Sequence, residues 1–396
     1  MKEVNFFIGT LSTGGAERVV SNLTLHLNNN ILRNILLFGE NSRIDYPYEG
    51  EILYLDKTKP NNFFRKIISL LLRKAKIWKL KKMNEDSVTI SFLEYPNLIN
   101  SLTSSSGKSI ISVRNHMSTK HSHGMKSKFW NLTIKYLYPR SDLIISVSEE
   151  IKRDLIKNYK IDESKIKVIY NSYDIHTIQE KSKEILEEKY NFIFEKPVII
   201  TAGRLNKQKG HWHLIRSFSV VKKAIPNAQL IILGEGNLES YLKKLTFDLE
   251  IDDSVHFLGF QKNPFKYISK SKIFVMTSFH EGFPNALAEA MACGVPVVSS
   301  DCKSGPREIL APSEFDYKEM NYKICKNRYG ILTPVCDGSM YKAEDAITSE
   351  EMQIANSILS ILKNQDLYKH FSIQSKNRIK DFEINRIIND WESVIY

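Results

Sequence analysis

Two glutamates, Glu281 and Glu289, stand out in the segment FVMTSFHEGFPNALAEAMACGVPVVSSD, residues 274–301. An apolar run ends shortly before Glu281, and Pro284 suits the first turn of a helix because its missing N–H would have no partner there. We therefore predict a helix from about Pro284 to Ala292, with Glu289 inside it. The positive N-terminal end of a helix favours phosphate oxygens, and the two carboxylates can accept hydrogen bonds from hydroxyl groups on either side. The pattern predicts a site for a sugar nucleotide.

Two cations occur in a second loop, TAGRLNKQKG, which follows an apolar run. Arg204 and Lys209 flank a predicted turn between a strand and a helix, where two fixed cations could hold a diphosphate. The alternative interpretation is an ordinary solvated basic loop.

A glycine pair marks a third loop, GTLSTGG, after the first apolar run of the chain. Gly14 and Gly15 allow unusual dihedral angles and close approach of the backbone. The helix predicted from about Ala16 would direct its first N–H groups toward the loop, so a phosphate or a sugar could bind there. A tight connection without a ligand is the alternative.

These loops follow strands in a chain where short apolar runs alternate with amphipathic segments. The predicted strands are 4–8, 35–38, 88–92, 109–113, 143–147, 198–202, 229–233, 255–258, 273–276 and 295–299. Alternation of this kind is typical of α/β proteins with parallel sheets. A polar stretch around 176–196 divides the pattern, so we predict an N-terminal domain at 1–185 and a C-terminal domain at 192–380, both doubly wound. Ligands of such sheets bind beyond the carboxyl ends of the strands.

The net charge of +11 is distributed unevenly. Residues 57–82 contain ten basic residues and no acidic one, and we predict an amphipathic helix over 63–82. Its apolar stripe would be Phe64, Ile67, Ile68, Leu71, Ala75 and Trp78, with Arg65, Lys66, Arg73, Lys76 and Lys79 off the stripe. Such a helix can lie on an anionic bilayer surface. A packed core face is one alternative, and a nucleic-acid surface with interleaved aromatic residues is another.

Other classes of protein are less consistent with the sequence. No run approaches the roughly 20 apolar residues of a membrane-spanning helix, and the N-terminal stretch is too soon interrupted by glycine for a signal peptide. The four cysteines lack paired spacing, and no histidine cluster suggests zinc. We expect no metal and a cytoplasmic protein, either soluble or peripheral to a membrane.

The combined motifs resemble a known enzyme family over nearly the whole chain. The spacing of Glu281 and Glu289 in HEGFPNALAEAMACGVPVVSSD is similar to the signature of the retaining family 4 glycosyltransferases, also called glycosyl transferases group 1. The second half also resembles that family in AGRLNKQKG, LGEG, FLGF, GPREIL and YGILTPVCDG, and the first half in GGAERV, ISVRNH and ISVSEEI. The resemblance implies the GT-B fold of two Rossmann-like domains, with a final helix at 381–396 that crosses back onto the N-terminal domain.

The resemblance also implies roles for individual residues. Arg204 and Lys209 would bind the donor diphosphate, Glu289 the ribose and Glu281 the donor sugar. Further contacts with the donor would come from Gly282, Phe283, Pro284 and Asn285, and Gly14 and Gly15 would face the bond that breaks. His116 in SVRNHMS is similar to a sugar-contacting histidine of the family, although Arg114 competes for that role.

The implied activity is retaining and metal-independent, without a cofactor. The enzyme would transfer a hexose or N-acetylhexosamine, with UDP as the expected nucleotide, to a lipid-diphosphate-linked oligosaccharide in bacterial glycan assembly. The predicted basic helix would contact an anionic surface on the inner face of the cytoplasmic membrane. The alternatives are a soluble glycosyltransferase with a small acceptor and, in a different class, a nucleic-acid or other anionic-surface binding protein.

Overall fold

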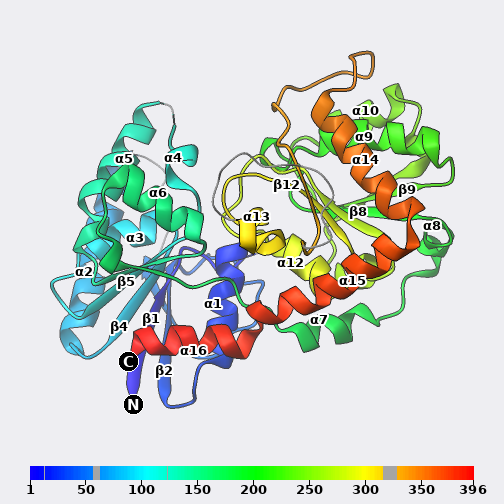
Figure 1. Cartoon of the computed structure of the whole chain (residues 1–396). Coiled ribbons are helices and arrows are strands. Elements are labelled where there is room, and N and C mark those ends of the chain that lie inside the picture. Colours follow the sequence, from blue (N-terminus) through cyan, green and yellow to red (C-terminus); the bar gives the residue numbers. More distant parts are fainter. Residues whose placement is uncertain (13, 57–62, 123, 315–327) are drawn as a thin grey trace. The chain divides into compact units, whose positions relative to one another are not determined.

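A computed structural model of the chain divides into two compact units (Figure 1). It describes residues 1–12, 14–56, 63–122, 124–314 and 328–396. Unit 1 comprises Met1–Ser172 together with Ile384–Tyr396, and unit 2 comprises Tyr173–Glu383.

The division falls earlier than the sequence suggests, at Ser172 and not in the polar stretch around 176–196. That stretch contains the helix α7 (Ile175–Ser182), which buries Ile178 and packs against helices of unit 2. A polar composition here belongs to a surface helix and does not mark a linker.

Unit 1 is built on a seven-stranded sheet in the order β3-β2-β1-β4-β5-β6-β7, in which every neighbouring pair is parallel. Its strands are β1 (Lys2–Phe7), β2 (Ile31–Gly39), β3 (Glu51–Asp56), β4 (Val88–Phe92), β5 (Lys108–Val113), β6 (Leu143–Ser146) and β7 (Ile166–Val168). The central strands β4 and β5 are buried along almost their whole length, serines and Thr89 included, because helices cover both faces of a parallel sheet.

The helices of unit 1 form two layers. They are α1 (Gly15–His26), α2 (Phe63–Met83), α3 (Glu94–Ser101), α4 (Met117–Lys120), α5 (Met125–Tyr136), α6 (Glu149–Tyr159) and α16 (Ile384–Ile395), with a 3₁₀ turn at Tyr138–Arg140. The helices α1 and α16 contact each other on one face of the sheet, and α2, α3, α5 and α6 cover the other (Figure 1). Right-handed crossovers explain the two layers. The connection from β1 to β2 runs toward one edge of the sheet, and the connections after β3 run toward the other edge, so their helices lie on opposite faces.

Unit 2 has a six-stranded sheet in the order β10-β9-β8-β11-β12-β13, and its pairs are also all parallel. The strands are β8 (Val198–Ala202), β9 (Gln229–Leu233), β10 (Val255–Gly259), β11 (Ile273–Met276), β12 (Val297–Ser300) and β13 (Ile331–Thr333). The helices are α7, α8 (Asn191–Phe194), α9 (His211–Ala224), α10 (Glu239–Asp248), α11 (Phe265–Ile268), α12 (Asn285–Ala292), α13 (Pro306–Leu310), α14 (Ser349–Lys363) and α15 (Gln365–Ile379).

The predicted fold class is confirmed: two doubly wound parallel sheets, and a final helix that returns to the N-terminal unit. The last helix α16 repeats apolar residues at helical spacing and buries them against unit 1. Its Trp391 packs near Phe92 of β4, with ring centroids 6.0 Å apart.

Three strands were absent from the sequence prediction, namely β3, β7 and β13. All three lie at sheet edges, and β7 and β13 have only three residues each. Strands of three residues are too short to form a recognisable apolar run, and β3 is only partly buried, so it shows no buried run either.

Within the described ranges, no helix combines the length and hydropathy that crossing a bilayer requires.

Candidate active site

Two loops at the carboxyl end of the second sheet are joined by hydrogen bonds. One follows β8 and the other follows β11. The Thr277 hydroxyl donates to the Lys209 carbonyl at 3.0 Å, the Phe279 N–H to the Gln208 carbonyl at 2.9 Å, and the Gln208 amide to the His280 carbonyl at 2.8 Å. The two sequence motifs are therefore parts of one rigid structure.

Lys209 and Glu281 form an ion pair across these loops. Lys209 Nζ lies 2.5 Å from Glu281 Oε1, and both side chains are largely buried. The aliphatic stem of Lys209 passes beside Gly203. Arg204, the other predicted cation of this loop, is exposed. The sequence predicted both charged residues of the pair, but not that they would contact each other.

The helix α12 begins at Asn285, with Pro284 as its N-cap, and confirms the predicted helix to within one residue. Its first N–H groups have no acceptor within the helix and so remain suited to an anion. Gly305 has φ 93°, and a Cβ there would lie 2.5 Å from the Pro284 ring, so only glycine lets this loop approach the helix start. Glu289 is buried in the second turn.

The segment before α12 is held by its own unit. Phe283 packs edge-on against Phe382 with centroids 5.1 Å apart, and the Tyr173 hydroxyl donates to the Asn285 amide oxygen at 2.8 Å. Gly282 is buried, and the Glu281 carbonyl accepts a hydrogen bond from Ser304. These contacts fix the backbone that would face a donor.

A third loop of this edge, LGEG, lies directly against the first. Gly234 has φ 129°, and a Cβ there would come within 2.1 Å of the Gly203 carbonyl oxygen. Glycine is therefore required for the two loops to pack backbone against backbone.

The start of α9 carries a neutral histidine beside the ion pair. Burial, assisted by the charge of Lys209, lowers the pKa of His211 to about 3. At neutral pH the imidazole carries no charge, so Lys209 is the positive group at this helix start.

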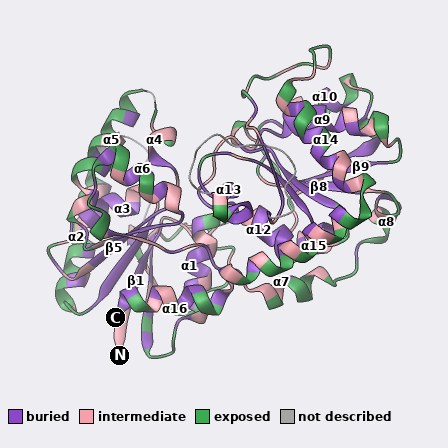
Figure 2. Cartoon of the chain, viewed as in Figure 1, coloured by how far each residue is buried: buried purple, intermediate pink, exposed green. Residues whose placement is uncertain are grey.

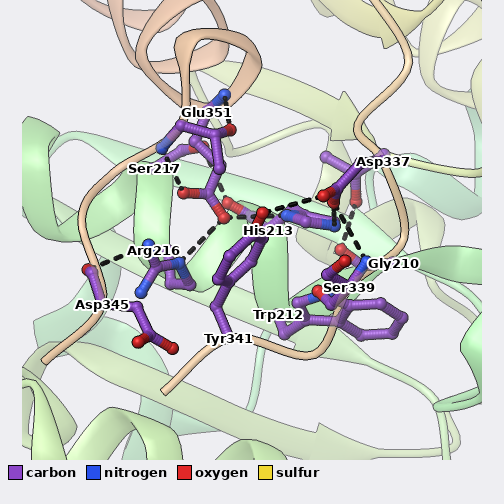
Figure 3. Close-up of polar contacts among 12 residues, drawn as sticks. Gly210, Trp212, His213, Arg216, Ser217, Asp337, Ser339, Tyr341, Asp345 and Glu351 are labelled. Carbon is purple, nitrogen blue, oxygen red and sulfur yellow. Dashed lines mark hydrogen bonds and ion pairs between the residues drawn. The ribbon is translucent and has the colours of Figure 1, made fainter. Parts of the chain in front are cut away.

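Behind the loops lies a buried charged network that the sequence analysis missed (Figure 3). His213 Nδ1 lies 2.8 Å from Glu351 Oε1, and Arg216 Nε donates to the same oxygen at 2.9 Å. All three side chains are fully buried. Burial raises the pKa of Glu351, but hydrogen bonds from His213 and Arg216 outweigh that effect and leave the pKa below its ordinary value.

The same network anchors the chain between β13 and α14. Arg216 donates to the carbonyl oxygens of Lys342, Asp345 and Ala346, and the Trp212 indole donates to the Ser339 carbonyl at 2.8 Å (Figure 3). Trp212 and His213 also pack against Phe279, two residues before Glu281. The network therefore positions the loop that carries Glu281. A charged residue at an apolar helix position, Arg216 in HLIRSF, was the available signal.

In unit 1, the predicted glycines lie at the start of α1. Gly14 is its N-cap in an extended conformation, and Gly15 is its first residue and is exposed. The Glu17 carboxylate lies over Gly14, where a Cβ would meet its oxygen at 2.1 Å. A carboxylate at this position disfavours a phosphate and suits a hydroxyl group.

His116 lies just beyond β5, buried between two carboxylates of α6. Its Nε2 is 3.7 Å from Glu150 Oε1, its Nδ1 is 3.6 Å from Asp154 Oδ2, and the Thr119 hydroxyl is 2.9 Å from Nδ1. Arg114 is buried too, and its guanidinium donates to the Asn171 side chain. The structure thus places both candidates near the carboxyl end of one strand.

The predicted basic helix is present as α2, but one of its assigned cations, Arg73, is wrong as a surface group. Arg73 is buried, with Nη2 2.7 Å from Asp56 Oδ2 and its guanidinium 4.1 Å from the Phe38 ring centroid. Lys76 is exposed, as predicted, although its ammonium donates to the Leu55 carbonyl at 2.5 Å. Helical spacing shows which residues share a face, but not which face meets the sheet.

The remaining predicted cations of α2, Arg65, Lys66 and Lys79, are exposed. The predicted apolar stripe is exposed as well: Ile67, Ile68, Leu71 and Trp78 are between 41% and 59% accessible, and Ala75 is exposed, as is the neighbouring Leu72. The side chain of Phe64, predicted on the same stripe, lies outside the described residues.

Comparison with known proteins agrees with this arrangement. The model for "Glycosyltransferase Family 4" matches residues 13–177, and that for "Glycosyl transferases group 1" matches residues 182–318. An uncharacterized glycosyltransferase of Methanocaldococcus jannaschii is 36% identical over 360 residues, with 88% of each chain covered. The chain belongs to glycosyltransferase family 4.

A second relative of this glycosyltransferase has a more informative name. It is the N-acetylgalactosamine-N,N'-diacetylbacillosaminyl-diphospho-undecaprenol 4-alpha-N-acetylgalactosaminyltransferase of Campylobacter jejuni, 31% identical over 395 residues with 98% of each chain covered. Among solved structures, Anabaena HepE in complex with UDP superposes with a TM-score of 0.75, 17% identity and coverage of 100% of this chain and 99% of that one. The similarity confirms the GT-B fold of the glycosyltransferase.

The site residues of the glycosyltransferase thus fall into two groups. Unit 2 brings together the loops of Lys209, Glu281 and α12, and unit 1 holds His116 and Arg114 near one strand end. The individual roles predicted for these residues, and for Gly14 and Gly15, stay predictions.

Proposed function

We propose that this glycosyltransferase is retaining and metal-independent, and that it moves a hexose or N-acetylhexosamine from a UDP-sugar to a saccharide linked to a lipid diphosphate. The observation that carries the proposal is the Lys209–Glu281 pair next to the start of α12. It sets a cation, a carboxylate and the N-terminal end of a helix side by side, the chemistry that a diphosphate joined to a sugar requires.

The donor can replace Glu281 as the partner of Lys209. Lys209 then binds the diphosphate. With Arg204 and the N-terminal end of α12, it neutralises the negative charge that develops as the nucleotide leaves. These groups can do electrostatically what a metal ion does in other transferases, so no metal or cofactor is proposed. Glu281, released from Lys209, accepts hydrogen bonds from the sugar, and Glu289 accepts them from the ribose.

The reaction itself needs no protein nucleophile. The bond between the sugar C1 and the phosphate oxygen breaks, and the acceptor oxygen forms the new bond to C1 on the same face. The departing phosphate oxygen takes the proton of the acceptor hydroxyl.

The proposed acceptor rests on relatives and on unit 1. The Campylobacter relative is named for a diphospho-undecaprenol acceptor, and the exposed apolar stripe and cations of α2 suit the surface of an anionic membrane, which we propose as the place of action. A peripheral location on the inner face of the cytoplasmic membrane is part of the same proposal.

A product assay tests this function. Purified enzyme is incubated with a panel of UDP-sugars and an undecaprenyl-diphosphate-linked acceptor, and the anomeric configuration of the product is determined by NMR. We expect one sugar to be transferred with retention, and activity to survive a chelator. Inversion, or complete loss of activity with the chelator, would contradict the proposal.

A pair of variants examines the site. Lys209→Ala should lower transfer by about 10²-fold, the scale of losing one preorganised charge-stabilising group. Lys207→Ala, an exposed lysine two residues earlier, is the matched control and should retain activity. Equal activity in both variants would exclude Lys209 from the donor site.

A further inference from the structure

The helix α5 exposes a continuous apolar stripe. Met125, Phe129, Leu132 and Tyr136 follow one another at spacings of four, three and four residues, which places them on one side of the helix. All four are between 54% and 88% accessible, while Ser127, Thr133 and Ile134 face the interior. A helix normally buries its large apolar residues, so this exposed stripe indicates a surface that another molecule covers.

The charges of α5 are of one sign. Lys126, Lys128 and Lys135 are exposed beside the stripe. No aspartate or glutamate occurs anywhere between residues 95 and 141. The surface of α5 is therefore apolar and cationic, without the acidic residues that ordinarily balance lysines.

The stripe of α5 lies on the same side of the sheet as that of α2. The helix α2 contacts α3, α3 contacts the turn Tyr138–Arg140, and that turn contacts α5. Figure 1 shows the four helices α2, α3, α5 and α6 on one face of the unit 1 sheet, and Figure 2 shows exposed residues along α2 and α5. Both stripes are exposed on this side of the sheet, and the exposed sides of α2 and α5 are here together called the α2/α5 face.

The composition of the α2/α5 face favours a lipid surface over a protein partner. Protein–protein interfaces are depleted in lysine, whereas this face combines lysines with large aliphatic and aromatic side chains. Lysine stems can lie along the apolar boundary while their ammonium groups reach phosphate headgroups, and side chains such as Phe129 and Leu132 enter the acyl boundary. The face is complementary to negative headgroups above a hydrocarbon layer.

We propose that α5 is a second membrane-contact helix, which with α2 docks unit 1 on an anionic phospholipid bilayer. The inference deepens the proposed function and rests on it for the location of the acceptor. Two separate helices fix the orientation of unit 1 on a membrane, which a single helix leaves free to roll.

Vesicle co-sedimentation tests the proposal. The full chain is mixed with phosphatidylcholine vesicles, and with vesicles that also contain phosphatidylglycerol. The parent should bind the second kind, and raised salt should weaken the binding by screening. Replacing Lys126, Lys128 and Lys135 by Gln should weaken binding by roughly 100-fold, since each lysine near such a surface adds on the order of a tenfold factor or somewhat less.

A pair of substitutions in the apolar stripe tests its contribution to binding separately from that of the lysines. Phe129→Ser with Leu132→Ser should weaken binding at least about tenfold. The matched control is Phe247→Ser with Ile373→Ser, two equally exposed apolar residues of unit 2, which should bind as the parent does. Thermal unfolding of all variants should coincide with that of the parent.

Several outcomes would overturn the proposal. They are a parent chain that ignores anionic vesicles, α5 variants that bind them as well as the parent, or a dimer that dissociates in the Phe129/Leu132 variant while vesicle binding is unchanged. A separate assay of transfer to a water-soluble acceptor distinguishes failure of the proposed function. The α5 variants should keep that activity, and its absence in the parent with every UDP-sugar would refute the function while leaving the vesicle result standing.

Discussion

Two helices of unit 1, α16 and α2, are both amphipathic, yet α16 turns its apolar side toward the sheet and α2 turns much of its apolar side toward solvent. The apolar residues of α16 are buried against the sheet beside α1, and Trp391 is only 1% accessible. On α2, Trp78 is 47% accessible, and the residues that face the interior are Ser69, Arg73 and Lys81 beside Ile77. The helix α2 thus buries two basic residues along with Ile77 and leaves much of its apolar surface exposed.

The difference shows that an amphipathic pattern defines a stripe but not its partner. The elements beneath α2 supply specific acceptors: Asp56 of β3 for Arg73, and Asn100 of α3 and Ser109 of β5 for Lys81. A buried cation with such partners can be tolerated, and the apolar side is then left outward. The helix α5 also leaves an apolar stripe exposed on this side of the sheet, although it buries no charged residue.

The two tryptophans give the largest expected contrast. Trp391→Ala should lower the free energy of unfolding by about 4 kcal/mol, because it removes a large side chain from a packed core. Trp78→Ala should change it by less than about 1 kcal/mol. Urea denaturation of both variants measures the difference, and similar losses would show that α2 is packed in solution.

The cations of α2 give a second contrast. Arg73→Gln should cost about 3 kcal/mol, because Asp56 remains buried without its partner. Arg65→Gln, at an exposed position, should stay within about 0.5 kcal/mol. An unchanged urea midpoint for the Arg73 variant would show that Arg73 is exposed, as the sequence pattern predicted.

Lys81 adds a dependence on pH. Burial lowers its pKa to about 7, and the charge of Asp142 offsets only part of that effect. The unfolded chain keeps the proton up to about pH 10.4. Between these values the unfolded state binds more protons, so the free energy of unfolding rises with pH.

Comparison with Lys81→Met isolates this contribution. From pH 7 to pH 9 the parent should gain about 2 kcal/mol relative to that variant. Lys79→Met, at an exposed position of the same helix, should follow the parent. Parallel pH profiles for all three proteins would mean that Lys81 is solvated.

The smallest effect is expected on the outer stripe. Leu71→Gln removes an exposed leucine and should change the free energy of unfolding by less than about 0.5 kcal/mol. A loss of several kcal/mol in thermal unfolding would instead indicate that the stripe is covered by protein, for example in a self-associated form.

Much of the fold was predictable because its central strands are short β-rich runs without charged residues, as in 88–92 and 198–202. The helix after Pro284 was recognisable from the proline at its start. The strands β7 and β13 were not predicted because they have only three residues each, and β3 because it is only partly buried. The site loops were identified from glycines, cations and the two glutamates.

The sequence by itself determined the alternation of strands and helices, the positions of Arg204, Lys209, Glu281 and Glu289 after strands, and the excess of cations at 57–82. Only the tertiary structure decided that Lys209 pairs with Glu281, that Arg73 turns inward to Asp56, and that α5 lies on the same side of the sheet as α2 (Figure 1). The spacing of apolar residues that identifies a helix or a strand depends only on residues within that segment of the chain. Ion pairs and burial depend on which segments the sheet brings together, and that depends on the topology of the fold.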